Sequence, residues 1–319
     1  MMPVKKPSKV IVTGGSGFIG SHLVDYLLHQ DIDVVVFDNF SSGTEKNLMF
    51  ARNSKQLCVV KMDLTKNKLN SRLFEDADII FHLAASLGVK YATQHPSTVL
   101  MKNLIGVCRL FNICIRSGVK RLVFASSSEV YGNCEQSPVS ESFPLSPISS
   151  YGMSKMTGES LCKASYDEFG LQSCIIRYFN VYGPRQDTRT RSWVVPNFIC
   201  NALLNKSIMI HGRGTQTRDF TYVDDAIKGT YLVSTRGIGN ADAYNIGTGE
   251  ETSINELAAL VKEITAKEVP TRHTRDRKFQ ISRRCADISK ASKKLGYFPE
   301  IDLRTGLEYS RKYYEGVLS

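Results

Sequence analysis

The sequence lacks the features of membrane-spanning and secreted proteins. Its 319 residues contain no uninterrupted apolar run near the roughly 20 residues that cross a bilayer. The basic N-terminus leads directly into a strand-like run, without the apolar core of a signal peptide. None of the eight cysteines belongs to a C-x-x-C pair or lies at metal-ligand spacing from a histidine. We therefore expect a cytoplasmic protein with reduced cysteines, no membrane contact and no metal.

The sequence is rich in positive charge. It has 41 Lys and Arg residues against 31 Asp and Glu, a formal net charge of +10, which suits an anionic partner. The arginines gather late in the chain, but no nucleic-acid-binding motif and no run of aromatic residues accompanies them. We therefore expect a small ligand that carries a diphosphate, and no nucleic acid.

The first half of the chain alternates short β-branched runs with helical patterns. Strands are predicted over 9–13, 34–38, 57–61, 78–82, 121–125 and 173–177, and helices over 18–29, 97–117 and 151–169. Such alternation indicates an α/β fold with a doubly wound, parallel Rossmann sheet. The rest mixes strands at 208–210, 219–222 and 243–246 with helices near 253–265, 287–295 and 303–314.

We accordingly expect a Rossmann domain over residues 1–179, to which later segments contribute. A smaller mixed α/β lobe over 180–319 is expected to bind the substrate. No low-complexity linker separates the two, so the lobe should pack directly on the first domain.

A glycine-rich turn follows the first strand. Gly14, Gly17 and Gly20 are spaced G-x-x-G-x-x-G where a helix opens. This spacing allows a sharp turn, close approach of a pyrophosphate to main-chain N–H groups, and tight helix packing. Asp38 ends the second strand; a carboxylate there accepts hydrogen bonds from the adenosine ribose and repels a 2′-phosphate. The pair predicts NAD, not NADP, as cofactor.

A second motif combines a serine run, a tyrosine and a lysine. Tyr151 and Lys155 are four residues apart on a predicted helix, so both side chains lie on one face. A phenol with a pKa of about 10 is a poor base, but a nearby ammonium and a positive nicotinamide lower that pKa. Ser127, at the preceding strand end, could hold a substrate hydroxyl. The Y-x-x-x-K pattern alone is common, and the glycine turn and serine run make it informative.

Together these motifs resemble the extended short-chain dehydrogenase/reductase family, in particular its NAD-dependent nucleotide-sugar epimerases and dehydratases. The resemblance extends over nearly the whole chain. Further matching segments are 38–43, 63–64, 82–85, 103–106, 177–185, 212–220, 244–247 and 286–291.

The resemblance implies roles for individual residues. The expected cofactor contacts are Gly14, Gly17, Phe18, Ile19, Gly20, Asp38, Asn39, Ser41, Ser42, Gly43, Asp63, Leu64, Leu83, Ala84, Ala85, Asn103, Tyr151, Lys155 and Tyr178. The expected substrate contacts are Ser127, Ser128, Asn180, Val195, His211, Arg218 and Arg277. Asn103 could instead only tie two strands together. Many epimerases carry an acidic residue where this chain has Gln280, which leaves UDP favoured but less distinct from other nucleotides.

The resemblance favours a UDP-hexose 4-epimerase that works through a transient 4-keto sugar. Tyr151 would accept the O4 proton, Ser127 would position O4, and Lys155 would tune Tyr151. The alternative is a lyase, either a 4,6-dehydratase or a UDP-glucuronate decarboxylase, in which Glu129 takes part as in the T-D-E and T-S-E triplets of those enzymes. A binding protein for NAD or RNA without turnover is a third hypothesis, against which the intact catalytic residues argue.

The resemblance also implies a homodimer. Its interface would be a four-helix bundle built from the 97–117 and 151–169 helices of two subunits. Apolar positions on these helices are Val99, Cys108, Phe111, Leu161 and Cys162, which a monomer core could equally use.

Overall fold

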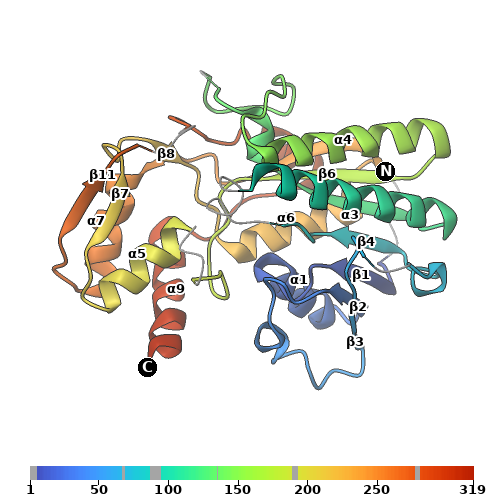
Figure 1. Ribbon diagram of the computed structural model, residues 1–319, viewed down its shortest axis with the longest axis horizontal. Coiled ribbons are helices and arrows are strands. Elements are labelled where there is room, and N and C mark those ends of the chain that lie inside the picture. The colour runs from blue at the N-terminus through green and yellow to red at the C-terminus, as the bar shows by residue number, and fades with distance from the viewer. Residues whose placement is uncertain (1–5, 67–68, 87–94, 135, 189–192, 277–280) are drawn as a thin grey trace.

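The main structural element is a seven-stranded parallel sheet with the order β3-β2-β1-β4-β5-β6-β9 (Figure 1). The computed structural model describes residues 6–66, 69–86, 95–134, 136–188, 193–276 and 281–319. The strands of this sheet are β1 (Lys9–Thr13), β2 (Asp33–Asp38), β3 (Leu57–Lys61), β4 (Ile79–His82), β5 (Arg121–Ser127), β6 (Ser173–Tyr178) and β9 (Asn240–Ile246). The order reverses between β1 and β4, so the predicted doubly wound Rossmann arrangement is confirmed.

Helices cover both faces of this sheet. On one face lie α1 (Phe18–His29) and α6 (Val223–Arg236), and on the other lie α3 (Pro96–Arg116) and α4 (Ser150–Phe169) (Figure 1). Alternate strand residues therefore enter two different cores. In β5, Val123 and Ala125 belong to the core with α1 and α6, whereas Leu122 and Phe124 belong to the core with α3 and α4. Burial on both faces explains the nearly continuous apolar strands. Three short 3-10 helices are η1 (Glu45–Leu48), η2 (Ser71–Leu73) and η3 (Ser128–Tyr131).

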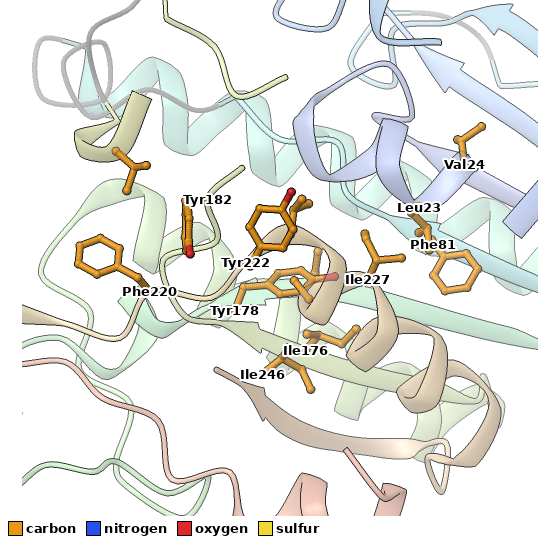
Figure 2. Packing of buried hydrophobic residues seen from close by; sticks show 14 of the residues in the cluster. Leu23, Val24, Phe81, Ile176, Tyr178, Tyr182, Phe220, Tyr222, Ile227 and Ile246 are labelled. Carbon is orange, nitrogen blue, oxygen red and sulfur yellow. The ribbon is translucent and has the colours of Figure 1, made fainter. Parts of the chain in front are cut away.

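The C-terminal lobe is built from helices and two small sheets. Strand β7 (Ile208–His211) pairs with β11 (Thr271–Thr274), and β8 (Thr217–Arg218) pairs with β10 (Thr252–Ser253). The helices are α5 (Val194–Leu203), α7 (Ile254–Thr265), α8 (Ser289–Leu295) and α9 (Leu303–Leu318). Figure 2 shows that the α1/α6 core continues from Leu23 and Ile176 to Tyr182, Tyr222 and Phe220. One core therefore joins the lobe to the sheet.

Several predicted elements differ from the structure. The strand predicted over 219–222 is wrong: β8 ends at Arg218, and Tyr222 makes only an isolated bridge with Tyr182. The apolar alternation there comes from Phe220 and Tyr222, which pack edge-on against the Tyr182 ring instead of forming a strand face. Helices α5 and α6 were not predicted, and β9 starts earlier than expected.

Among the described helices, α3 alone has the length and apolar composition of a membrane span, with a mean hydropathy of 1.5. Its Val107, Leu110 and Phe111 nevertheless lie in the core that α3 shares with α4 and the sheet. The core helix of a globular protein has this same composition.

Candidate active site

Most of the expected cofactor contacts gather at one edge of the main sheet. They follow the carboxyl ends of successive strands: Gly14–Gly20 after β1, Asp38 and residues 39–43 after β2, Asp63 and Leu64 after β3, Leu83–Ala85 after β4, and Tyr178 at the end of β6. In open parallel sheets, ligands bind outside these ends, where the strand order reverses. The structure thus brings together segments that are far apart in the sequence.

The glycine turn lies at the point of reversal. Gly14 has φ +73°, and a Cβ on it would lie 2.7 Å from the Ala84 nitrogen, so the turn and the end of β4 are in direct contact. A Cβ on Gly20 would lie 2.1 Å from the Gly14 oxygen, which explains the close packing of α1. The buried Ser16 hydroxyl has no hydrogen-bond partner among the residues that the structure describes. A polar orphan beside a helix N-terminus fits the phosphates of a dinucleotide.

Asp38 connects the glycine turn to the loop after β2. Its buried carboxylate accepts hydrogen bonds from the main-chain nitrogens of Ser16 (3.0 Å) and Phe40 (2.8 Å). A Cβ on Gly43 would lie 2.7 Å from the Ser16 carbonyl oxygen, so this loop also needs a glycine. Each carboxylate oxygen can accept a second hydrogen bond, so the geometry stays compatible with the predicted ribose contact.

Two other expected cofactor residues, Asp63 and Asn103, form hydrogen bonds with nearby segments of the same chain. Asp63 accepts hydrogen bonds from the nitrogen (2.9 Å) and hydroxyl (2.7 Å) of Thr65, and a further one from Asn39. Asn103 accepts from the Ser86 nitrogen (2.7 Å) and donates to the Ser154 hydroxyl (3.2 Å). Asn103 therefore ties the segment after β4 to helix α4, and not two strands to each other as the structural alternative had it.

The structure brings Ser127, Tyr151 and Lys155 together. Helix α4 packs against β5. Its first turn is capped by the Ser149 hydroxyl, which accepts a hydrogen bond from the Gly152 nitrogen at 2.9 Å. The Ser127 hydroxyl hydrogen-bonds Tyr151. The Lys155 Nζ donates to the Ala125 oxygen at 2.6 Å and lies 5.6 Å from the centroid of the Tyr151 ring.

Burial sets the protonation of this pair. Burial, and next the Glu129 carboxylate, raise the pKa of the Tyr151 phenol well above its ordinary value, while the Ser127 hydrogen bond acts in the opposite direction. Burial lowers the pKa of Lys155 to about 8, against the effect of Glu159. At neutral pH Lys155 is therefore mostly charged, and a positive charge beside the phenol favours its phenolate form.

Glu129 lies beside the pair in η3. Its Oε2 accepts a hydrogen bond of 2.5 Å from the Ser149 hydroxyl. The buried Arg284 interacts electrostatically with Glu129 and donates to the Gly132 oxygen at 3.3 Å. The sequence indicates no role for Arg284, because the residues around it are basic and resemble an exposed segment. Ser128 is buried next to Glu129.

His82 is a second residue that sequence analysis did not assign to the site. It ends β4, and its Nδ1 lies 2.7 Å from the Thr13 hydroxyl. Burial, and next the Lys155 charge, lower the pKa of His82 to about 3. A neutral imidazole therefore lies beneath the glycine turn.

Apart from Ser127 and Ser128, the expected substrate contacts that the structure describes lie on the lobe side. Asn180 donates to the Asp219 oxygen at 3.0 Å, next to Arg218, whose Nη1 donates to the Thr217 oxygen at 2.6 Å. His211 lies at the end of β7, with its Nδ1 2.8 Å from the Thr274 hydroxyl, and Val195 is buried in α5. Arg277 lies outside the described residues, as does Gln280.

Tyr178 ends β6, and its phenol contacts helix α6. Its hydroxyl lies 2.5 Å from the Thr230 hydroxyl of α6, and its ring belongs to the core shown in Figure 2. The Tyr178 hydroxyl is therefore engaged on the α6 side, and its contact with the nicotinamide stays a prediction.

The chain is similar in sequence to proteins named for two different reactions, an epimerisation and a decarboxylation. The chain is 35% identical over 309 residues to a UDP-glucose 4-epimerase of Mycolicibacterium smegmatis, covering 96% of this chain and 98% of that protein. It is 32% identical over 319 residues to UDP-glucuronic acid decarboxylase 1 of Danio rerio, covering 98% of this chain and 74% of that protein.

Solved structures and a family model agree with these relatives. A UDP-glucose 4-epimerase of Thermotoga maritima with UDP-glucose superposes with a TM-score of 0.92 at 34% identity, covering 98% of this chain and 100% of that one. A UDP-glucuronic acid 4-epimerase of Bacillus cereus, in complex with UDP-glucuronic acid and NAD, gives 0.91 at 33% identity, covering 97% and 99%. The model of the NAD dependent epimerase/dehydratase family matches residues 10–247. The chain therefore belongs to the NAD-dependent epimerase/dehydratase family.

Proposed function

We propose that this NAD-dependent enzyme is a UDP-hexose 4-epimerase. The observation that carries the proposal is the Ser127–Tyr151–Lys155 group at the end of β5, next to the glycine turn. The relatives and solved structures named epimerases support it. Arg218 and Asn180 on the lobe side supply the polar groups that a nucleotide diphosphate requires.

Each residue has a defined task in this proposal. NAD supplies a hydride acceptor for C4 and the donor that returns the hydride to the other face of the sugar. Tyr151 takes the proton from O4 as C4 is oxidised and gives it back on reduction. Lys155 stabilises the phenolate, and Ser127 orients O4. Because the phenol and the ammonium are buried, their mutual interaction is stronger than in water.

A lyase is the alternative, and one pairing favours it. Glu129 interacts electrostatically with Tyr151, and the buried Arg284 interacts electrostatically with Glu129. A UDP-uronic acid carries a carboxylate at C6 that a guanidinium could bind. A UDP-glucuronate decarboxylase is accordingly the second candidate.

Product analysis separates the two. The purified protein is incubated with UDP-, GDP- and dTDP-hexoses and with UDP-glucuronate, and products are identified by mass and NMR. An epimer of unchanged mass from a UDP-hexose is expected. Loss of carbon dioxide from UDP-glucuronate, or of water from a hexose, would establish the lyase instead.

We also propose a homodimer through α3 and α4. Of the five apolar positions named from the sequence, Val99, Phe111 and Cys162 are buried within the chain, so they cannot form the interface. The exposed apolar residues of this face are Met101, Ile105, Cys108 and Met153. Light scattering at micromolar concentration should give twice the chain mass, and Ile105→Glu should give the monomer; a monomeric wild type would refute the dimer.

A further inference from the structure

A buried group of charged side chains lies directly beneath the catalytic residues. The Glu159 carboxylate accepts hydrogen bonds from the Ser126 hydroxyl (2.5 Å) and from Arg177 Nε (3.0 Å) and Nη2 (2.6 Å). All three side chains are buried, with Glu159 and Arg177 each 6% exposed. Arg177 also donates to the Tyr131 hydroxyl at 2.9 Å, which in turn donates to Asn245 at 2.7 Å. The group thus links α4 to β5, β6, β9 and η3.

Helix periodicity places Glu159 on the catalytic face of α4. Tyr151, Lys155 and Glu159 follow each other at intervals of four residues, so their side chains lie along one stripe. Three consecutive residues of β5 meet this stripe: the Ala125 oxygen accepts from Lys155, Ser126 donates to Glu159, and Ser127 bonds Tyr151. The bond between Ser126 and Glu159 therefore fixes the residue that precedes Ser127.

Charge gives Glu159 a second connection to the site. Lys155 is 5% exposed, and a buried ammonium is costly unless a negative charge lies near. The titratable groups that face Lys155 are Tyr151 and Glu159 on α4 and the neutral His82 on β4, with Glu129 of η3 beyond Tyr151. Of these, Glu159 is the one that favours the charged lysine.

We propose that Glu159 is a positioning residue of the enzyme, which keeps Lys155 charged and holds Ser127 in register with Tyr151. The proposal rests on the catalytic roles of Tyr151 and Lys155 stated above. Arg177 neutralises Glu159 from the side away from the reaction, so the carboxylate stays ionised without leaving an unpaired charge in the core.

The test uses Glu159→Gln and the double variant Glu159→Gln/Arg177→Gln. The double variant removes both charges together, so no unpaired ion remains if the single variant fails to fold. We expect the alkaline limb of the kcat/KM–pH profile to move down by roughly one pH unit, because Lys155 loses its proton more easily. NMR titration of ¹³C-labelled Lys155 should show the same shift without any turnover.

Matched variants separate the two effects. Glu168→Gln changes an exposed glutamate of the same helix and should leave the profile unchanged. Ser126→Ala keeps every charge and should lower kcat about tenfold without moving the limb. A Lys155 midpoint equal to that of wild type in the double variant would overturn the charge role, and a wild-type kcat in Ser126→Ala would overturn the register role.

The parent proposal fails in a different way. If Tyr151→Phe and Lys155→Ala leave turnover intact, the catalytic assignment is wrong whatever Glu159 does. If those variants are inactive while the Glu159 and Ser126 variants match wild type, only the positioning role is wrong.

Discussion

The two sides of the site are held in place by different means. On the sheet side, Tyr151 and Lys155 lie on a long helix that is fixed to β5 by buried side-chain hydrogen bonds. On the lobe side, Asn180 and Arg218 lie on or beside irregular chain. Main-chain nitrogens from separate segments of the lobe side donate hydrogen bonds to a single buried carboxylate, that of Asp219. The proposed reacting groups thus stand on long regular elements, which hold geometry best, while Asn180 lies on irregular chain and Arg218 ends the two-residue strand β8.

Asp219 connects three segments of the lobe side. Its Oδ1 accepts hydrogen bonds from the nitrogen (2.9 Å) and hydroxyl (2.7 Å) of Thr248, and its Oδ2 accepts from the nitrogens of Gly249 (3.0 Å) and Ala286 (3.1 Å). The side chain is fully buried. On the lobe side one residue therefore holds the segments together, whereas on the sheet side several hydrogen bonds between different elements do so.

The largest expected effect comes from a sheet-side substitution that lowers kcat and leaves stability unchanged. Tyr151→Phe removes the proton acceptor and should lower kcat by about 10²–10⁴-fold, with an unchanged melting temperature. Tyr166→Phe, on the same helix, is the control. A loss under tenfold, about 1.4 kcal/mol of barrier, would contradict the assignment of Tyr151.

On the lobe side the largest effect should be on stability. Asp219→Ala leaves four donors without their acceptor and should lower the free energy of unfolding by roughly 3 kcal/mol or more. Urea denaturation measures this, with the exposed Asp276→Ala as control. A change below about 1 kcal/mol would show that the lobe side does not depend on this carboxylate.

Acid should weaken the sheet side through His82. Its pKa is about 3 in the folded protein against an ordinary 6.5, so between these values the unfolded chain binds a proton that the native protein does not. His82 should therefore lower the free energy of unfolding by about 2 kcal/mol between pH 7.5 and pH 5. The slope of stability against pH should be correspondingly smaller in His82→Gln; an equal slope would mean that His82 can be protonated in the fold.

The smallest of these effects concerns cofactor choice. Asp38→Asn keeps the side-chain size but removes the charge that repels a 2′-phosphate. The preference for NAD over NADP should narrow about tenfold, or roughly 1.4 kcal/mol, in titrations of cofactor binding. Asp33→Asn, at the exposed first residue of β2, makes the same change away from the site and serves as the control. If Asp38→Asn kept the wild-type preference for NAD over NADP, the Asp38 carboxylate would not determine cofactor selectivity.

The same contrast decides what the sequence could predict. Strands β1 to β6 were predicted within two residues, because each is a short run rich in β-branched or other apolar residues, and all but the edge strand β3 are largely buried. The glycine turn and the Tyr151–Lys155 pair were found because their spacing is itself the signal. The Val223–Arg236 helix was missed, since its acidic start and its Lys228 and Thr230 obscure the apolar stripe.

Interactions between distant residues could not be predicted in this way. Glu159 and Arg177 look like ordinary charged residues in the sequence, and only the fold buries them together. The sequence pattern placed Asp219 in a strand and indicated no role for its carboxylate. Its four hydrogen-bond donors come from residues about 30 and 67 positions away, which no local pattern reveals. Such contacts depend on the packing of the whole chain and leave no periodic pattern.

The central claim is that the enzyme oxidises C4 and returns the same hydride. The most direct test is turnover of a UDP-hexose in D₂O by the wild type and by Glu129→Gln, with products examined by mass and NMR. We expect a C4 epimer of unchanged mass, no deuterium at C4 or C5, and activity of the variant within about tenfold of wild type. Deuterium at C5, a lighter product, or a loss of about 10²–10⁴ in Glu129→Gln would contradict the account and establish a lyase.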